Sequence, residues 1–97
     1  MDFTLNRDCG QLYVDDRRWL YETVLALKPQ MALETGTWKG GGSTFYIASA
    51  LRDSECGGVL YSIETDVVVF AAAVMRYTRD WPHLMPSVSL WHGNSLD

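Results

Sequence analysis

The sequence has no run of basic residues and few cysteines, and both shortages narrow the possible functions. Eight Lys and Arg residues stand against twelve Asp and Glu, which gives a formal net charge of −4. A nucleic-acid-binding domain carries clustered positive charge, so we expect no nucleic-acid partner. Cys9 and Cys56 lack the spacing of a metal site. We therefore expect reduced thiols and no metal ligands.

Long apolar runs are also missing. No stretch approaches the ~20 apolar residues that cross a bilayer. Residues 1–8 lack the apolar centre of a secretory signal, so we expect a cytoplasmic protein without a membrane partner. The chain has 97 residues, of which 47% are hydrophobic. This is enough for one domain at most, with a modest core.

Apolar periodicity divides the chain into alternating helices and strands. Asp15 and Asp16 open a helix that ends at Lys28-Pro29. Strands are predicted at about 31–35, 58–64 and 87–92, and further helices at about 43–52 and 66–80. Thr65-Asp66 is the helix-start signal of the last of these. Such alternation predicts βαβ units and a parallel sheet. The apolar face of the first helix would comprise Trp19, Leu20, Thr23, Val24 and Leu27.

The most informative stretch runs from Met31 to Thr44, with the sequence MALETGTWKGGGST. An apolar run ends in Glu34, a glycine-rich turn follows, and Ser43 and Thr44 are residues that cap helices. Glycines allow a sharp turn and a close approach of the backbone to a ligand. The pattern is typical of a strand–loop–helix unit that holds a cofactor.

Three kinds of ligand are usual for such a turn. A nucleoside triphosphate loop needs Lys where Gly42 stands, and Glu34 would repel phosphate. A dinucleotide loop needs a glycine where Trp38 stands. S-adenosylmethionine carries an amino group and a sulfonium and has no phosphate, so an acid at the strand end favours it.

The segment Leu33–Gly41, LETGTWKGG, together with Ser43 and Thr44, resembles motif I of class I S-adenosylmethionine-dependent methyltransferases. It is most similar to the subgroup of small-molecule O-methyltransferases. Trp38 replaces the middle glycine of the usual motif, and the loop has one glycine more than the subgroup pattern. The resemblance implies that the cofactor is bound by Glu34, Gly36, Thr37, Trp38, Gly40, Gly41, Ser43 and Thr44.

Later positions extend the resemblance. Glu64 ends the second strand and would accept hydrogen bonds from ribose hydroxyls. Replacing Glu64 with Ala should then lower affinity with little loss of stability. Asn94 and Ser95 follow the third strand, where the family places Gly-Asp-Ser beside the adenine. Tyr77, Trp81 and Met75 are expected in the core, and His92 as a core histidine.

The implied fold is α/β and Rossmann-like, a three-layer α/β/α arrangement around a parallel sheet. The chain would supply the N-terminal half of a seven-stranded methyltransferase sheet of order 3-2-1-4-5-7-6. Residues 1–30 would form an N-terminal segment and helix, and residues 31–97 the part that binds S-adenosylmethionine. The missing half of the family domain would hold the methyl acceptor and, where the family uses one, a divalent metal.

The implied function is methyl transfer to a small-molecule acceptor at oxygen, although the 97 residues alone would be inactive because no convincing base is present. Two alternatives stay open. One is a non-catalytic half-domain that pairs with a partner or a second copy, and the other is a nucleotide-binding oxidoreductase fragment. In the family order the first strand would lose a neighbour, so residues 31–33 would form a bare apolar edge prone to self-association.

Overall fold

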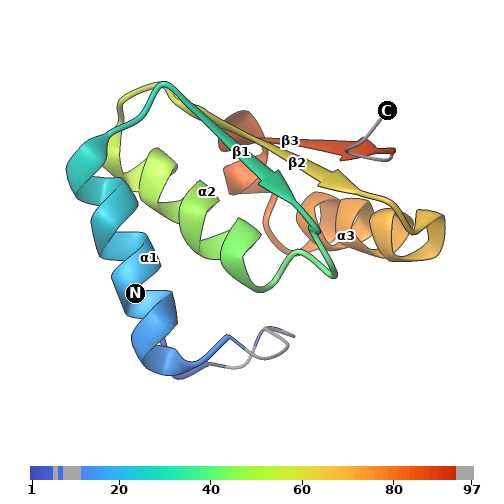
Figure 1. Cartoon of the computed structure of the whole chain (residues 1–97), viewed down its shortest axis with the longest axis horizontal. Helices are drawn as coiled ribbons and strands as arrows, with labels where there is room; N and C mark the ends of the chain where they lie inside the picture. The colour runs from blue at the N-terminus through green and yellow to red at the C-terminus, as the bar shows by residue number, and fades with distance from the viewer. Residues whose placement is uncertain (6, 8–11, 94–97) are drawn as a thin grey trace.

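The computed structural model describes residues 1–5, 7 and 12–93 (Figure 1). All the helices and strands expected from the sequence are present, with bounds within two residues of those predicted. A short 3-10 helix that opens at a proline is an addition. The elements follow in the order α1 (Val14–Leu27), β1 (Met31–Thr35), α2 (Ser43–Ser54), β2 (Val59–Glu64), α3 (Val67–Arg79), η1 (Pro82–Ser87) and β3 (Val88–His92).

The three strands form one parallel sheet in the order β1-β2-β3. The connections β1-α2-β2 and β2-α3-β3 both lead to the next strand in the same direction across the sheet. Because such connections are right-handed, both helices lie on the same face of the sheet. Figure 1 shows this arrangement, with α2 and α3 beneath the sheet and α1 beside α2. The predicted α/β, Rossmann-like parallel sheet is confirmed.

The core lies between the helices and the sheet face that they cover. Tyr46 and Leu51 of α2 are buried there against Leu60 of β2, Tyr77 of α3 and Leu84 of η1. Full burial of a large apolar side chain contributes about 1.5–3 kcal/mol. The packing of α2 on the sheet therefore fixes the start of that helix, where the glycine-rich loop ends.

The other face of the sheet is open, and this differs from the three-layer expectation. The described residues form two layers, because every helix among them lies on one side (Figure 1). Large apolar side chains of the strands are consequently exposed, at 69% for Met31, 71% for Leu33 and 56% for Trp91. Strand β2 is covered on one face, and its Tyr61 is 36% exposed.

The expected apolar face of α1 is wrong in part. Trp19 and Leu27 are exposed, and the residues that pack against the core are Leu20, Tyr21 and Val24. The reason is that α1 packs on α2 rather than beneath the sheet. A helix with one helical neighbour buries a narrow strip, and the residues that flank the strip stay in water.

Three further expectations have mixed outcomes. Tyr77 and Trp81 are buried as predicted, whereas Met75 of α3 is 63% exposed, since it lies on the outer side of that helix. His92 is exposed rather than buried in the core. Its ring packs on Phe70, and its Nε2 lies 3.2 Å from the carbonyl oxygen of Thr65.

Cys56 is a free thiol, and Cys9 lies outside the described residues. No helix in the described ranges is both long enough and apolar enough to cross a membrane.

Candidate functional site

The candidate site is the glycine-rich loop, residues 36–42, which joins the carboxyl end of β1 to α2 (Figure 1). In open α/β sheets, ligands bind outside the carboxyl ends of the strands. Glu34 is the penultimate residue of β1, and Glu64 is the last residue of β2. The loop therefore starts between two strand-end carboxylates.

Glu34 links β1 to α2 and to β2. The hydroxyls of Ser43 and Thr44 donate to its carboxylate, and the Ser62 hydroxyl donates to Oε1 at 2.7 Å. The expectation that Ser43 and Thr44 cap the helix is wrong. Gly42 occupies the N-cap position without a side-chain bond, and the two hydroxyls are drawn back to the carboxylate of Glu34.

Glu64 is buried and holds two backbone amides. Its Oε1 accepts from the amide of Trp38 at 2.9 Å, and its Oε2 accepts from the amide of Asp66 at 3.0 Å. An ionised carboxylate has about four lone-pair sites. Two are used here, which leaves two for a ligand such as a ribose. Asp66 itself caps α3 by accepting from the amides of Val68 and Val69, as its place before the helix predicts.

Ser62 is a site residue that sequence reasoning missed. It is fully buried on β2, and its hydroxyl lies 2.6 Å from that of Thr37, a buried residue of the loop. Because it also donates to Glu34, it connects the loop to the strand-end acid. The available signal was a small polar residue inside an otherwise apolar strand.

Tyr77 of α3 is a second missed residue, since the sequence predicted only a place in the core for it. Its hydroxyl donates to the carbonyl of Gly40 at 2.8 Å. Burial, and then the negative charge of Glu34, raise the pKa of Tyr77, so the phenol stays protonated and keeps its donor. Gly40 has φ +82°, and an added Cβ would lie 2.6 Å from the Tyr77 ring, so only glycine fits there.

Trp38 has the left-handed backbone conformation that glycine favours, with φ +55°. For a residue with a Cβ this costs roughly 1–2 kcal/mol, and the bond from its amide to Glu64 offsets the cost. The indole is half-exposed, and the ammonium of Lys39 lies 5.7 Å from its ring centroid. Trp38 thus lies on the outer surface of the loop.

The structure also explains why two further loop positions are occupied by glycine. Gly36 turns the chain out of β1 with φ +85°, and its amide donates to the carbonyl of Ile63 at 2.7 Å. At Gly41, an added Cβ would lie 1.5 Å from the carbonyl oxygen of Arg7. Arg7 therefore lies directly against the loop.

The electrostatics of the site disfavour phosphate. Phosphate-binding loops present free amides and a positive helix end. Here the amide of Trp38 is bonded to Glu64, and the start of α2 faces Glu34. Two carboxylates beside one loop favour a ligand that is cationic or rich in hydroxyl donors.

Two predicted site residues, Asn94 and Ser95, lie outside the described residues. The other predicted residues meet at the loop or at the strand ends beside it. No group of three His, Cys, Asp or Glu residues in the described part of the chain could hold a metal ion.

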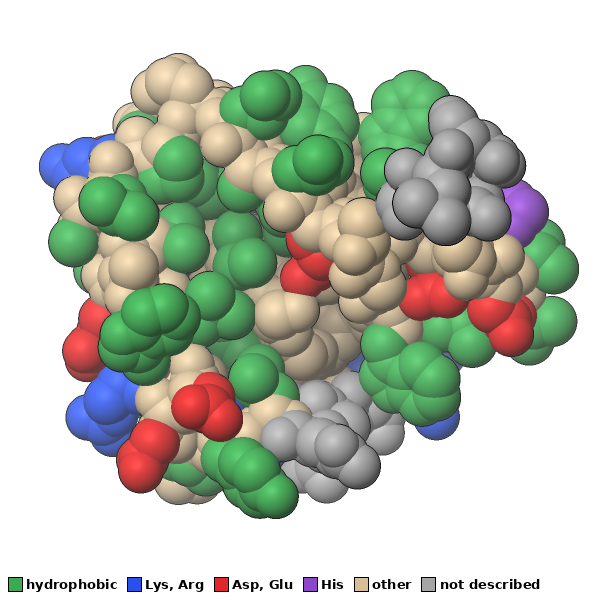
Figure 2. Space-filling view, in the orientation of Figure 1, with side chains coloured by type: hydrophobic (Ala, Val, Ile, Leu, Met, Phe, Trp, Pro, Cys, Tyr) green, Lys and Arg blue, Asp and Glu red, His purple; other side chains and the backbone are tan. Residues whose placement is uncertain are grey.

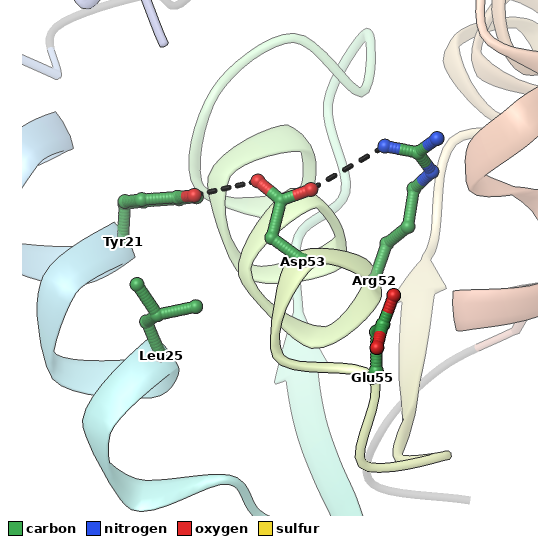
Figure 3. Close-up of a pocket in the computed structure, with 5 residues that line it drawn as sticks. All are labelled: Tyr21, Leu25, Arg52, Asp53 and Glu55. Carbon is green, nitrogen blue, oxygen red and sulfur yellow. Dashed lines mark hydrogen bonds and ion pairs between the residues drawn. The ribbon is translucent and has the colours of Figure 1, made fainter.

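A cavity of about 540 Å³ lies elsewhere, between α1 and the carboxyl end of α2 (Figure 3). The Tyr21 hydroxyl donates to Asp53 at 2.5 Å, and Arg52 pairs with the same carboxylate at 3.3 Å. Desolvation, and then the bond to Asp53, raise the pKa of Tyr21 to about 12. These polar groups satisfy one another, so the cluster acts as a clamp between two helices.

No protein-family model matches the sequence, and no curated protein matches it. Among solved structures, the S-adenosylhomocysteine-bound methyltransferase PaMTH1 of Podospora anserina is similar, with a TM-score of 0.74 and 20% sequence identity. The similarity covers 91% of this chain and 35% of that chain, so this chain spans about a third of its length. The likeness shows the fold alone, which is an α/β, Rossmann-like parallel sheet similar to part of that methyltransferase.

Proposed function

We propose that the chain binds S-adenosylmethionine and forms the cofactor-binding part of a methyltransferase that acts on a small molecule at oxygen. One observation carries the proposal. A glycine-rich loop leaves the carboxyl end of a parallel strand between two acids: Glu64 accepts from the loop amide of Trp38, and Glu34 accepts from Ser43 and Thr44, where the loop enters α2. The similarity in fold to a methyltransferase supports the same reading.

The charge of the site supports this cofactor over nucleotides. S-adenosylmethionine has a sulfonium and an ammonium group, which two neighbouring carboxylates attract. ATP and NAD would bring phosphates to the same place, where Glu34 repels them. The free lone pairs of Glu64 would accept hydrogen bonds from the ribose hydroxyls. The loop backbone at residues 36–41 would lie against the rest of the cofactor.

The bound cofactor would supply a methyl group by direct displacement at its sulfonium methyl carbon, with the sulfur leaving as a neutral thioether. The residues of this chain would hold and orient it, which is the larger part of such catalysis. We place the acceptor wall, the base and any metal outside residues 1–97, so these residues alone would transfer no methyl group.

A second candidate is a non-catalytic half-domain that pairs through its sheet. The open sheet face and the edge position of β1 favour it. It predicts no affinity for any nucleoside, whereas a nucleotide-binding oxidoreductase fragment, the third candidate, predicts affinity for NAD.

Calorimetric titration of the purified chain separates these candidates. We expect weak binding of S-adenosylhomocysteine and no heat from NAD or ATP. Glu64→Gln should weaken that binding, and Glu22→Gln, at an exposed position on α1, should leave it unchanged. Binding of NAD or ATP without S-adenosylhomocysteine would show that the methyltransferase proposal is wrong.

A further inference from the structure

The outer side of α3 is a surface that the proposed methyltransferase domain would leave in contact with water. Figure 2 shows hydrophobic side chains gathered over the strands along the top of the view, on the sheet face opposite the helices. A seven-stranded sheet of the expected order would add strands beside β1 and helices on that open face. Helix α3 lies on the other face and packs against β2, β3 and η1 (Figure 1). Its outer side therefore stays accessible when such elements complete the sheet.

A groove of about 320 Å³ lies on this side, between α3 and the glycine-rich loop. It is lined by Lys39 of the loop and by Ala72, Met75, Arg76 and Arg79 of α3. The four helix residues have the spacing of one helix face, so they form a single stripe along α3. Ligand pockets have volumes of about 300–1,000 Å³. The groove therefore has room for a small molecule.

The groove is positively charged, although the whole chain has a net charge of −4. Lys39, Arg76 and Arg79 are cationic, and the two other lining residues are apolar. Beside the groove, Asp80 pairs with Nε of Arg76 and with Nε of Arg79, each at 3.0 Å. Three positive charges and one negative charge give these four side chains a sum of +2. A doubly charged anion would match that sum.

The cations of the groove can also donate hydrogen bonds. A guanidinium has five N–H groups, and Arg79 directs two of them to Asp80, from Nε and Nη2, which leaves three. The Lys39 ammonium lies 5.7 Å from the Trp38 ring centroid, an attraction that needs no hydrogen bond. The Arg76 guanidinium lies over the Trp81 ring, 4.5 Å from its centroid, and this contact holds it in place. Arginine with lysine is a combination typical of phosphate binding.

We propose that the groove binds a small organic phosphate through its phosphomonoester group. Such a group has a charge of about −1.5 to −2 at pH 7, whereas a carboxylate would neutralise only half of the sum of +2. Ala72 and Met75, which is 63% exposed, offer apolar surface to the organic part, and a thioether adapts to many shapes. A nucleic acid presents singly charged diesters along an extended strand, which one small groove does not follow. This proposal does not depend on the cofactor.

The affinity of the groove should be modest, because its cations are partly in water. The side chain of Arg76 is 24% exposed and that of Arg79 is 69% exposed. Exposed ion pairs each contribute little, so we expect a dissociation constant of about 1–10 mM. ATP at the lower concentrations that titrate a cofactor site would leave the groove nearly empty. The calorimetric test of the cofactor site is therefore unaffected.

Heteronuclear NMR of the purified chain with phenyl phosphate at up to about 20 mM tests the proposal. We expect the amide signals of Ala72 and Met75 to shift and to saturate at about pH 7.5. Inorganic phosphate should bind about threefold more weakly or worse, because it has no apolar part. Benzoate should also bind more weakly, because it has a single charge. Lowering the pH to about 5 should weaken phenyl phosphate several-fold, since the pKa of its second proton is about 6.

Substitutions assign the binding to the groove. Lys39→Gln and Arg79→Gln should each raise the dissociation constant of phenyl phosphate about threefold, and the double variant about tenfold. Arg79→Lys keeps the charge and should stay within about twofold of wild type. Arg52→Gln is the matched control, because Arg52 is also exposed and pairs with the Asp that follows it. It should leave the dissociation constant unchanged.

Several results would overturn the proposal. One is the absence of saturable shifts at Ala72 and Met75 at about 20 mM phenyl phosphate. Others are an affinity that both Gln variants leave unchanged, equal weakening by Arg52→Gln, and benzoate or inorganic phosphate binding as tightly as phenyl phosphate. Circular dichroism checks that each variant keeps the fold. A variant that unfolds is replaced by Met75→Glu, which puts an acid in the groove and should raise the dissociation constant about tenfold or more.

Discussion

Replacing Glu64 with Ala tests whether this acid is a structural residue as well as a ligand. In the structure it holds the amide of Trp38 in the loop and the amide of Asp66 before α3. Hydrogen bonds to a charged group contribute about 1.5–3 kcal/mol each. Because the loop is partly open to water, we expect a total loss near the lower end, about 2–4 kcal/mol. This differs from the sequence-based expectation that stability would hardly change.

Such a loss would be easy to measure. A chain of this size has a free energy of unfolding of about 5–15 kcal/mol. With a urea m-value near 1 kcal/mol/M, the midpoint should fall by roughly 2–4 M. Glu64→Gln keeps one acceptor oxygen and should lose about half as much. Glu22→Ala removes an exposed acid and should stay within about 0.5 kcal/mol of wild type.

Two outcomes have different meanings. If Glu64→Ala unfolds at the wild-type midpoint, the two amide bonds do not stabilise the loop, and the stability inferred from their geometry is refuted. If stability falls and affinity for S-adenosylhomocysteine is unchanged in Glu64→Gln, Glu64 is a structural residue alone.

Two further substitutions test the loop and the helix clamp. Gly40→Ala should destabilise by about 2–4 kcal/mol, because it adds a positive-φ penalty and a collision with the Tyr77 ring; thermal unfolding measures this. Tyr21→Phe should change how stability depends on pH. Folding raises the pKa of Tyr21 from 10.0 to about 12, so its contribution is complete below pH 10 and is lost as pH rises to about 12. After allowance for screening at this half-exposed pair, the loss is about 1 kcal/mol. Between pH 9 and 11.5, urea unfolding should show a fall in stability that is larger by this amount in wild type than in Tyr21→Phe, because the raised pKa of Tyr77 lowers stability in both proteins.

Gly40→Ala has a matched control, and each test has an outcome that would contradict it. Gly57 has φ +77° and open space around it, so Gly57→Ala carries the backbone penalty without the collision. Equal losses for Gly40→Ala and Gly57→Ala would contradict the role given to Tyr77. Wild type and Tyr21→Phe losing stability in parallel between pH 9 and 11.5 would contradict the clamp.

Residues that are close together in the sequence were enough to predict the helices, the strands and the acids at the strand ends. Apolar β-rich runs bounded by turns predicted β1 and β2, and Asp66 predicted the start of α3. The places of Glu34 and Glu64 beside the loop could be predicted because each follows an apolar run, and parallel strands end at the same edge of a sheet. Their role as ligands of a cofactor stays a prediction. These features depend on neighbours within a few residues.

Features that depend on distant pairs could not be predicted. Ser62 lies 28 residues from Glu34, and Tyr77 lies 37 from Gly40, so neither pairing leaves a local pattern. The exposure of Leu33 and Leu27 could not be predicted from the sequence for a similar reason. Apolar alternation shows which side chains share a face and does not show what covers it.

The bonds around the loop also have a consequence for binding kinetics. Ser62, Glu64 and Tyr77 bond to the loop before any ligand arrives. The bonds from Ser43 and Thr44 to Glu34 fix the point where the loop enters α2. Association then requires little ordering of the backbone, so the entropy lost on binding comes mainly from the ligand. The association rate should be set by encounter rather than by a slow loop rearrangement. Hydrogen exchange at the amide of Trp38 should already be slow in the free protein, and a ligand should slow it only slightly further.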